Sequence, residues 1–571
     1  MAQNIVIIGG VALGSKAACR AKRLDPEAKV YLIDKDEYIS YGGCGIPFYI
    51  SGDVSDESEL RSTSFHMVRD ERFFLKDKGV IALTGTEATK IDRQKKIVHI
   101  RKKDKTTDTL PYDKLVIATG TNPRRLNLPG ENLENVFTVS NLRDAIAIKQ
   151  AVTNNSPEKA VIIGAGFIGL EMAEALSDMW EIETTIIEVF DQVMPGFIGP
   201  HMATMVKNRL NKHGVTVHTD EKVVEILGTG KVSGVRTDKR ELAADLVIMS
   251  AGVIPNTALA KEAGLELTPQ GLIVVNDKMQ TTDPDIYSGG DCVAIPNLIT
   301  GQPAYFPLGS MANRQGRVIG TNITGGKAAF DGAVGSFVVK VFDGSLAGAG
   351  LTVAKAKAAG FDAASVIVSQ FDRAHFYVEK EIIFLELVFD RQTRRVLGIQ
   401  GLGGPGSEMV GRINAVAATL KYKPLVDEIG NLEIAYSPPF ASAMDITNAL
   451  GNAAANFLDG RYHPMELDNF LDAWQNKEKG DVFFVDCRAL ADAQPFEKKF
   501  PNIWKSIPHD QLADRLNEVP RDKKIILVCN TGVRSYEAQL NLNAAGIKDN
   551  LSIGAGVAGL KESGVDFHLD E

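Results

Sequence analysis

Two of the five cysteines in this chain stand in surroundings suited to thiol chemistry. Cys44 lies between glycines in residues 38–49, and Cys529 directly follows the apolar run of residues 525–528. Residues 38–49 contain no second cysteine. A lone thiolate must complete a redox cycle through an external thiol, a sulfenic acid or a persulfide, because it has no neighbour for a local disulfide.

The residues around Cys529 predict a strand, a loop and then a helix. Residues 525–528 are β-like, and Gly532, Arg534 and Ser535 lie where the loop turns into the helix. A strand end followed by a glycine-containing loop and a helix N-terminus offers backbone N–H groups to an anion. These surroundings favour a thiolate at Cys529.

The N-terminal residues have the order of strand, glycine turn, helix, strand and acid that a dinucleotide site needs. Gly9 and Gly14 flank the turn, a helix is predicted over residues 15–24, and Asp34 ends the second strand. Val11 stands where the generic fingerprint has its second glycine. Glycines let the backbone approach a pyrophosphate, and the acid accepts hydrogen bonds from ribose hydroxyls.

The same order recurs with all three glycines present. Gly164, Gly166 and Gly169 precede a helix predicted from Leu170 onward, and Glu188 ends the following strand. No arginine or lysine follows in the next four residues. A carboxylate there would bond a free 2′-hydroxyl and repel a 2′-phosphate, so the sequence predicts NADH in preference to NADPH.

Two dinucleotide sites on one chain indicate electron relay between a flavin and a nicotinamide. Residues 112–120 end in Thr119 and Gly120, and residues 282–291 end in Asp291. Both segments resemble the flavin-contacting segments of the FAD-dependent pyridine nucleotide-disulfide oxidoreductases. The resemblance implies that the first site holds FAD and that Asp291 accepts a hydrogen bond from the ribityl chain.

Residues 38–49 are similar to the active-site segment of the single-cysteine branch of that family. The branch contains coenzyme A-disulfide reductases, NADH oxidases and peroxidases, and NADH-dependent persulfide reductases. Residues 434–440 look like the family segment whose tyrosine reaches the partner subunit's cysteine. The resemblance therefore implies a homodimer in which Cys44 is the nucleophile and Tyr436, with Tyr377, supplies an acid and hydrogen-bonding role.

Coenzyme A is a further ligand implied by this resemblance. In coenzyme A-disulfide reductases the phosphorylated adenosine end lies on basic residues of the first helix and on loops beside the cysteine. Four residues here match those positions, namely Arg20, Lys22, Arg23 and Ser40. Gly43 departs from the asparagine that many members have before the cysteine, and Phe376 departs from an expected tyrosine.

The C-terminal residues resemble a rhodanese domain. The string C-x-x-G-x-R-S begins at Cys529, and Asp486 and Arg488 follow an upstream apolar strand. The resemblance implies that Cys529 carries a terminal sulfur as a persulfide and that Arg534 stabilises the loop. Cys487 is assigned to the core.

The expected fold class is α/β, with two Rossmann-like domains, an α+β dimerisation domain and a C-terminal α/β rhodanese domain. A chain of 571 residues is too long for one core and agrees with several domains. The expected boundaries are 1–120 with 250–325 for FAD binding, 121–249 for NADH binding, 326–450 for dimerisation, 451–464 for a linker and 465–571 for the rhodanese domain.

Composition excludes several function classes. Acidic residues outnumber basic ones by 72 to 63, so no electrostatic drive favours nucleic acid. No apolar run is long enough to span a membrane, and none resembles a signal peptide. None of the cysteines forms a CxxC pair, which argues against zinc and predicts a cytoplasmic protein with no metal.

The resemblance as a whole implies an NADH-dependent FAD enzyme that reduces sulfur–sulfur bonds of persulfides, polysulfides or coenzyme A disulfides, with a rhodanese domain that handles sulfane sulfur. Three alternatives stay open. The protein could act mainly as a coenzyme A-disulfide reductase, or as an NADH oxidase in which Cys44 cycles through a sulfenic acid. It could also be a sulfur carrier in which the flavin part only resets the redox state.

Overall fold

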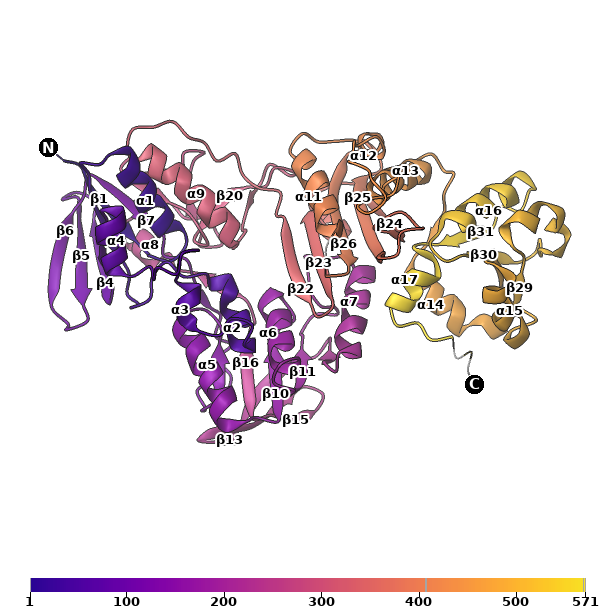
Figure 1. Ribbon diagram of the computed structural model, residues 1–571, viewed down its shortest axis with the longest axis horizontal. Coiled ribbons are helices and arrows are strands. Elements are labelled where there is room, and N and C mark those ends of the chain that lie inside the picture. The colour runs from indigo at the N-terminus through magenta and orange to yellow at the C-terminus, as the bar shows by residue number, and fades with distance from the viewer. Residues whose placement is uncertain (1, 406–407, 568, 570–571) are drawn as a thin grey trace. The chain divides into compact units, whose positions relative to one another are not determined.

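The computed structural model describes residues 2–405, 408–567 and 569. The chain forms two compact units. The first contains Met1–Val189 and His218–Ala333, and the second contains Phe190–Val217 and Val334–Glu571. Figure 1 labels the elements in chain order.

The first unit contains a parallel sheet in the order β19-β7-β1-β2-β3. Its central strand is almost fully buried because apolar residues lie on both faces, as in sheets covered on two sides. The strands are β1 (Asn4–Ile8), β2 (Lys29–Ile33), β3 (Ile81–Leu83), β7 (Lys114–Ile117) and β19 (Ile286–Ser288).

Helices α1 (Leu13–Leu24) and α9 (Gly309–Asn322) pack side by side in this unit (Figure 1). Small residues permit the contact. A Cβ on Gly316 would lie 2.7 Å from the Leu13 carbonyl oxygen, and one on Gly320 would lie 2.6 Å from the Ala17 oxygen. Helix α1 starts two residues before the predicted Ser15, because Gly14 already belongs to its first turn.

The second parallel sheet of this unit contains β11-β10-β16-β9. Its strands are β9 (Val136–Thr138), β10 (Lys159–Ile163), β11 (Glu183–Ile187) and β16 (Leu246–Met249), with helices α5 (Leu142–Asn155) and α6 (Phe167–Ser177). Helix α6 begins at Phe167 rather than at the predicted Leu170, because Gly166 is already its N-cap.

Two short antiparallel strands connect the two parallel sheets of the unit. The first comes after β7 of the first sheet, and the second comes after β16 of the second sheet, before the chain returns to β19. The pair is β8 (Thr121–Pro123) with β17 (Val253–Pro255). The remaining elements of the unit are the 3₁₀ turn η1 (Gly43–Gly45), helices α2 (Ile46–Ser51), α3 (Glu57–Leu60), α4 (Glu71–Lys78) and α8 (Ala258–Glu262), and strands β4 (Thr86–Asp92), β5 (Ile97–Lys102), β6 (Thr107–Pro111), β13 (Val223–Thr229), β14 (Lys231–Thr237), β15 (Glu241–Ala243), β18 (Ile273–Val274), β20 (Val293–Pro296) and β21 (Pro303–Ala304).

The second unit contains an antiparallel sheet in the order β22-β23-β26-β25-β24. Helix α13 packs on β24 and β25 and continues to Leu458. Residues 451–458, which the expected boundaries assign to the linker, form the last turns of this helix. The elements are β22 (Phe337–Val341), β23 (Gly344–Gly350), β24 (Ala363–Phe371), β25 (Ile382–Asp390), β26 (Val396–Gly403), α7 (Pro200–Lys212), α10 (Val353–Ala358), α11 (Glu408–Leu420), α12 (Val426–Gly430) and α13 (Ile446–Leu458), with β12 (Thr216–His218) at the boundary between the units.

A parallel sheet in the order β27-β31-β30-β28-β29 forms the C-terminal part of this unit. Aromatic rings fill one side of it, with Trp504 stacked on Phe484 and Phe496. The elements are β27 (Pro464–Met465), β28 (Val482–Asp486), β29 (Trp504–Ser506), β30 (Lys524–Val528), β31 (Asn550–Ile553), α14 (Leu467–Gln475), α15 (Leu490–Lys499), α16 (Val533–Ala544), α17 (Gly556–Glu562) and the 3₁₀ turns η2 (Lys477–Lys479), η3 (His509–Asp514) and η4 (Leu516–Glu518).

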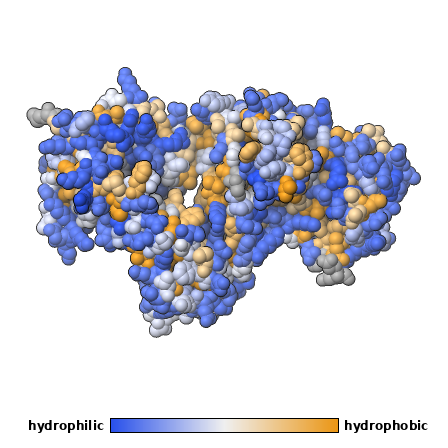
Figure 2. Space-filling view, viewed as in Figure 1, coloured by the Kyte–Doolittle hydropathy of each residue, from blue (hydrophilic) through white to orange (hydrophobic). Residues whose placement is uncertain are grey.

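The surface carries hydrophobic residues interspersed with hydrophilic ones on the face shown in Figure 2. Across the residues that the structure describes, none of the helices combines the length and apolar character needed to span a bilayer.

Candidate functional site

The first glycine loop follows β1 and has a backbone that only glycine accommodates. Gly9 has a φ of +106°, and a Cβ on Gly14 would lie 1.8 Å from the Gly9 oxygen. The Gly10 N–H donates to Asp34 Oδ2 at 2.7 Å. Burial raises the pKa of Asp34. The loop thus brings the predicted acid to the N-terminus of α1.

The second glycine loop repeats this arrangement after β10. Gly164 has a φ of +108°, and a Cβ on Gly169 would lie 2.0 Å from the Gly164 oxygen. The Ala165 N–H donates to Glu188 Oε2 at 2.7 Å, and Glu188 is buried. A Cβ on Gly166 would meet no protein atom within 4 Å, so this glycine faces open space at the start of α6.

Both loops fit a dinucleotide. In each, the loop backbone packs closely against the N-terminus of a helix, and a carboxylate lies at the end of the neighbouring strand. A helix N-terminus holds a pyrophosphate, and the carboxylate holds a ribose. In both loops a backbone N–H already holds the carboxylate in place.

The segments expected to contact flavin meet near α1. Thr119 Oγ1 donates to the Asn256 oxygen at 2.6 Å, and Gly120 has a φ of +61°. Asp291 follows a glycine pair that packs against Leu13. Its carboxylate makes no hydrogen bond to any of the described residues, and burial raises its pKa to about 6. A mostly desolvated carboxylate of this kind fits a ligand hydroxyl as its partner.

Cys44 lies in η1, exposed to solvent, at the N-terminus of α9. A Cβ on Gly309, the first residue of α9, would lie 3.5 Å from Cys44 Sγ, so glycine leaves space beside the sulfur. Partial burial, followed by the charges of Glu171 and Asp291, raises the pKa of the Cys44 thiol. The positive end of α9 favours the thiolate and opposes these effects.

Glu171 and Gly309 complete the surroundings of Cys44 and were missed by the sequence analysis. Burial raises the pKa of Glu171 to about 7. Glu171 lies in α6, two residues after Gly169, the last glycine of the second loop. Its position after that loop is the one signal that the sequence carried, whereas nothing near Gly309 in the sequence points to Cys44.

The four residues expected to bind coenzyme A have different surroundings. Lys22 Nζ donates to the carbonyl oxygens of Pro26 and Ala28 at 2.6 and 2.7 Å. Arg20 Nε donates to Thr321 Oγ1, and Arg23 is exposed. Buried Ser40 donates its N–H to the Gly10 oxygen. Lys22 is therefore bonded to the residues that follow α1, and Arg23 is the most exposed cation of the four residues.

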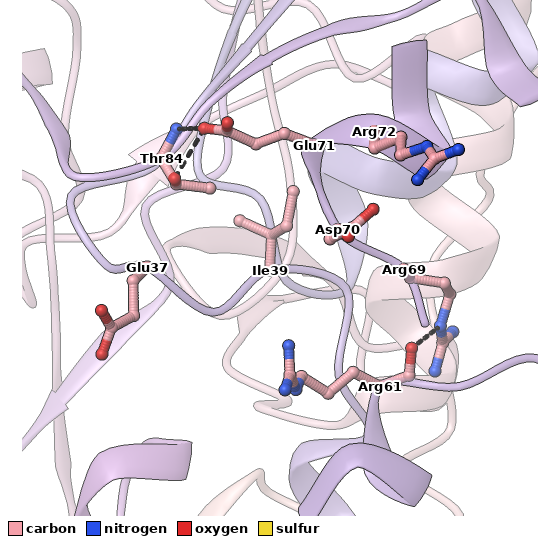
Figure 3. A pocket seen from close by; sticks show the side chains of 8 residues that line it. All are labelled: Glu37, Ile39, Arg61, Arg69, Asp70, Glu71, Arg72 and Thr84. Atoms are coloured by element: carbon pink, nitrogen blue, oxygen red, sulfur yellow. Dashed lines mark hydrogen bonds between the residues drawn. The ribbon is translucent and has the colours of Figure 1, made fainter. Parts of the chain in front are cut away.

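A pocket of about 330 Å³ lies beside Ile39, the residue before Ser40 (Figure 3). Arg69 donates to the carbonyl oxygens of Leu60 and Arg61 and so holds one wall together. In Figure 3, Glu71, bonded to Thr84, lies next to Arg72, and Arg69 and Arg61 lie near each other below them. Its lining residues are Glu37, Ile39, Arg61, Arg69, Asp70, Glu71, Arg72 and Thr84.

Cys529 lies at the end of β30 beneath the N-terminus of α16. The Gly532 N–H donates to Cys529 Sγ at 3.0 Å, and Ser535 Oγ lies 3.3 Å from the same sulfur. Ser552 Oγ in turn donates to Ser535 Oγ at 2.8 Å. One backbone N–H of the expected cradle thus donates to the sulfur. Ser535 belongs to the predicted loop, whereas Ser552, which lies in β31, was missed by the sequence analysis.

Asp486 and Arg488 form a buried ion pair. Arg488 Nη2 lies 2.7 Å from Asp486 Oδ2, and the Trp504 indole N–H donates to the same oxygen at 3.3 Å. Because both charges are buried with their partners, the pair holds the strand ends in place. Arg534 is half-buried, and its charge acts on Cys487.

Tyr377 and Tyr436 lie in the second unit, in two loops that contact each other. The Ala374 N–H donates to the Pro438 oxygen at 3.2 Å. Tyr436 is half exposed. No cluster of three or more His, Cys, Asp or Glu side chains suited to a metal ion occurs among the described residues.

Residues 3–315 match the family model for pyridine nucleotide-disulphide oxidoreductases. The chain belongs to this family. Residues 336–447 match the family's dimerisation domain, and residues 470–561 match a rhodanese-like domain. Members of the family use FAD and a nicotinamide nucleotide, in agreement with the two glycine loops.

Two solved structures cover nearly the whole chain, and a further relative covers about three quarters of it. The structure of an NAD-dependent persulfide reductase from A. fulgidus is 38% identical, with a TM-score of 0.91 over 97% of this chain and 99% of its own. The reduced CoADR-RHD of Bacillus anthracis is 31% identical, with a TM-score of 0.89 over 99% and 98%. An NAD(P)H sulfur oxidoreductase (CoA-dependent) of Pyrococcus abyssi is 34% identical over 78% of this chain and 96% of its own.

Proposed function

We propose that this protein is an NADH-dependent FAD enzyme that reduces the sulfur–sulfur bonds of persulfides, polysulfides or coenzyme A disulfides. The observation that carries the proposal is the single exposed Cys44 sulfur at the N-terminus of α9. A lone thiolate can open a sulfur–sulfur bond of an external substrate, but it cannot form a local disulfide of its own. The named relatives that reduce sulfur compounds support the same chemistry.

The two glycine loops divide the cofactors between them. The loop with Gly9, Gly14 and Asp34 holds FAD, together with Thr119, Gly120 and Asp291. The loop with Gly164, Gly166, Gly169 and Glu188 holds NADH. When bound, these cofactors supply the two electrons that a sulfur–sulfur reduction consumes.

Cys44 acts as the nucleophile in this proposal. Its Sγ forms a bond to one sulfur of the substrate, and the other sulfur leaves as hydrosulfide or a thiol. Burial raises the pKa of the Cys44 thiol, and the nearby Glu171 carboxylate raises it further, so Glu171 influences how readily Cys44 ionises. The space beside Gly309 admits the substrate sulfur.

The enzyme acts as a homodimer, with Tyr436 and Tyr377 reaching the active site of the partner. The exposure of Tyr436 and the match to a dimerisation domain support this arrangement. Its partners are small sulfur compounds rather than nucleic acid or membranes. The five free cysteines agree with a reducing cytoplasm.

Coenzyme A is the proposed carrier of the substrate sulfur. Arg20, Arg23 and Ser40 stay candidates for its contacts, whereas Lys22 is already bonded to two carbonyl oxygens. Arg61 and Arg72 in the pocket of Figure 3 are further cations for its phosphates, and Arg69 holds that wall. Arginine forks match phosphate oxygens in pairs, which makes them suitable donors.

The rhodanese domain handles sulfane sulfur at Cys529. The Gly532 N–H donates to the sulfur and favours an anion there, and Arg534 stabilises the loop. The Ser535 hydroxyl lies beside the sulfur and donates to the Gly532 oxygen. A persulfide on Cys529 would supply Cys44 with its substrate, directly or through a low-molecular-weight thiol.

NADH oxidation measured against polysulfide, coenzyme A persulfide, coenzyme A disulfide and oxygen tests the proposal. We expect Cys44→Ser to abolish turnover with all three sulfur substrates and Cys529→Ser to lower only the rates that depend on a sulfane sulfur donor. Cys19→Ser, at a half-buried position in the core, is the control. Polysulfide turnover that survives in Cys44→Ser would refute the assigned nucleophile.

The same measurements separate the alternatives. Oxygen as the best acceptor would indicate an NADH oxidase. Coenzyme A disulfide as the best acceptor would indicate a reductase that maintains a thiol pool. Sulfur transfer to a protein acceptor without NADH consumption would indicate a carrier.

A further inference from the structure

Cys487 and Cys529 end neighbouring parallel strands at the same level. The strands β28 and β30 pair with Asp486 opposite Val528, and each cysteine is the next residue. The Cys487 N–H donates to the Val528 oxygen at 2.8 Å, so the pairing continues to the cysteines. Neighbouring strands lie about 4.8 Å apart, within the range of Cα separations, about 4.4–6.8 Å, that disulfides span.

The two side chains also share a face of the sheet. Cys487 packs in one apolar cluster with Val485 and Leu527. Because side chains alternate between faces, Cys529, two residues after Leu527, projects to the same side. Burial raises the pKa of Cys487, and a charge on Cys529 raises it further, so the two sulfurs lie within electrostatic range of each other.

Beyond its packing in that cluster, the Cys487 thiol has no evident polar role in the fold. It is completely buried, and the Val485 oxygen, 4.0 Å away, is the one polar contact of its sulfur among the residues that the structure describes. The ion pair of Asp486 with Arg488 holds this strand end without it. A buried thiol beside a sulfur-carrying cysteine is therefore an unused nucleophile.

We propose that Cys487 is a resolving cysteine that discharges a persulfide on Cys529. This inference rests on the proposed role of Cys529 as the carrier of sulfane sulfur. It adds to that role a second product, a disulfide between Cys487 and Cys529.

The step balances without an added oxidant. Cys487 Sγ attacks Cys529 Sγ, the bond from Cys529 Sγ to the outer sulfur breaks, and its electron pair leaves with that sulfur. The outer sulfur takes the proton of the Cys487 thiol and departs as hydrogen sulfide. The sulfane sulfur is reduced by two electrons, and the two cysteine sulfurs are oxidised to the disulfide.

A low-molecular-weight thiol resets the pair. Two thiol molecules reopen the disulfide by exchange, leaving both cysteines reduced and one molecule of the oxidised thiol. That product is a disulfide of the class that Cys44 is proposed to reduce. Burial keeps Cys487 in the thiol form, because it raises its pKa, so the discharge is slow and competes only when no sulfur acceptor is present.

Peptide mapping of the full-length protein tests the proposal. The protein is loaded with inorganic polysulfide under anaerobic conditions, freed of excess reagent, incubated without NADH or thiol, and then alkylated in acid before trypsin digestion. Trypsin separates the cysteines into peptides 480–488 and 525–534, each with one cysteine. Sulfide is measured in parallel.

In the wild type we expect peptide 525–534 to gain one sulfur and then to lose it as a peptide linked to 480–488 appears with an equal amount of sulfide. In Cys487→Ser and Cys487→Ala the persulfide should persist at least tenfold longer. Cys19→Ser should behave as the wild type. Two substitutions are used because a buried hydroxyl could destabilise the domain, and the linked peptide in the wild type decides the matter if neither variant folds.

The possible failures are distinct. A peptide 525–534 that never gains sulfur would contradict the role proposed for Cys529. A peptide that gains sulfur, forms no linked product and loses sulfur equally fast in both Cys487 variants would overturn the resolving role and leave the carrier role intact.

Discussion

Arg412 donates to Asp445 Oδ2 through Nε at 3.1 Å and through Nη2 at 2.8 Å, and both residues are buried. Arg412 Nη2 also donates to the carbonyl oxygens of Asp372 and Phe440. These two oxygens belong to the loops that carry Tyr377 and Tyr436. One ion pair thus holds together the two segments proposed to reach the partner subunit.

Replacing Arg412 with methionine should destabilise the second unit by about 3–5 kcal/mol, because it leaves Asp445 charged and unpaired in the interior. Thermal unfolding measures the loss. Arg394→Ala is the matched control, since Arg394 pairs with Asp427 and Asp459 near the surface and should cost about 1 kcal/mol or less. Equal losses in the two variants would contradict the importance of the buried pair.

Glu171→Gln should make Cys44 reactive at lower pH. Burial raises the pKa of Glu171 to about 7, so the carboxyl becomes anionic as the pH rises through that value, and the anion then raises the pKa of Cys44. Glutamine removes this charge. The pH profile of the Cys44 alkylation rate should shift to lower pH in Glu171→Gln. It should be unchanged in Asp178→Asn, because Asp178 is an exposed acid directly after the same helix. An unshifted profile would show that Glu171 does not act on Cys44.

Glu188→Gln should shift the preference from NADH toward NADPH. The amide removes the charge that repels a 2′-phosphate, while an oxygen stays available for the Ala165 N–H. We expect the ratio of kcat/KM for NADH to that for NADPH to fall at least tenfold, about 1.4 kcal/mol. Glu183→Gln, at the exposed start of the same strand, should leave the ratio unchanged. A wild type that already prefers NADPH would overturn the assignment.

Asp486→Asn should unfold the rhodanese domain at lower temperature than the rest of the chain. Arg488 would be left buried without its counter-ion, at a cost of about 3–5 kcal/mol. Tryptophan fluorescence follows this transition, because Trp474 and Trp504 lie in the domain core. Lys505→Ala removes a neighbouring surface pair with Glu497 and Glu518 and serves as the comparison. If both variants melt together, the buried pair contributes no more than a surface one.

Local structure was predictable from sequence where all the residues that determine it lie in one short segment. The glycine loops at Gly9 and Gly164 follow from spacing, because a left-handed φ and a close helix approach each need glycine at a set position. Element ends were less predictable. Helix α6 starts at Phe167 rather than Leu170, since the loop glycine already serves as its N-cap. Helix α13 runs to Leu458 because the sheet buries its face.

By itself, the sequence determined the two glycine loops, the lone Cys44 and the strand-to-helix turn at Cys529, because each depends on neighbours within a few residues. Only the tertiary structure decided that Glu171 and Gly309 surround Cys44 and that Cys487 stands beside Cys529. Those relationships join segments far apart in the chain. Strand register and helix packing, which arise from burial of the whole core, bring them together.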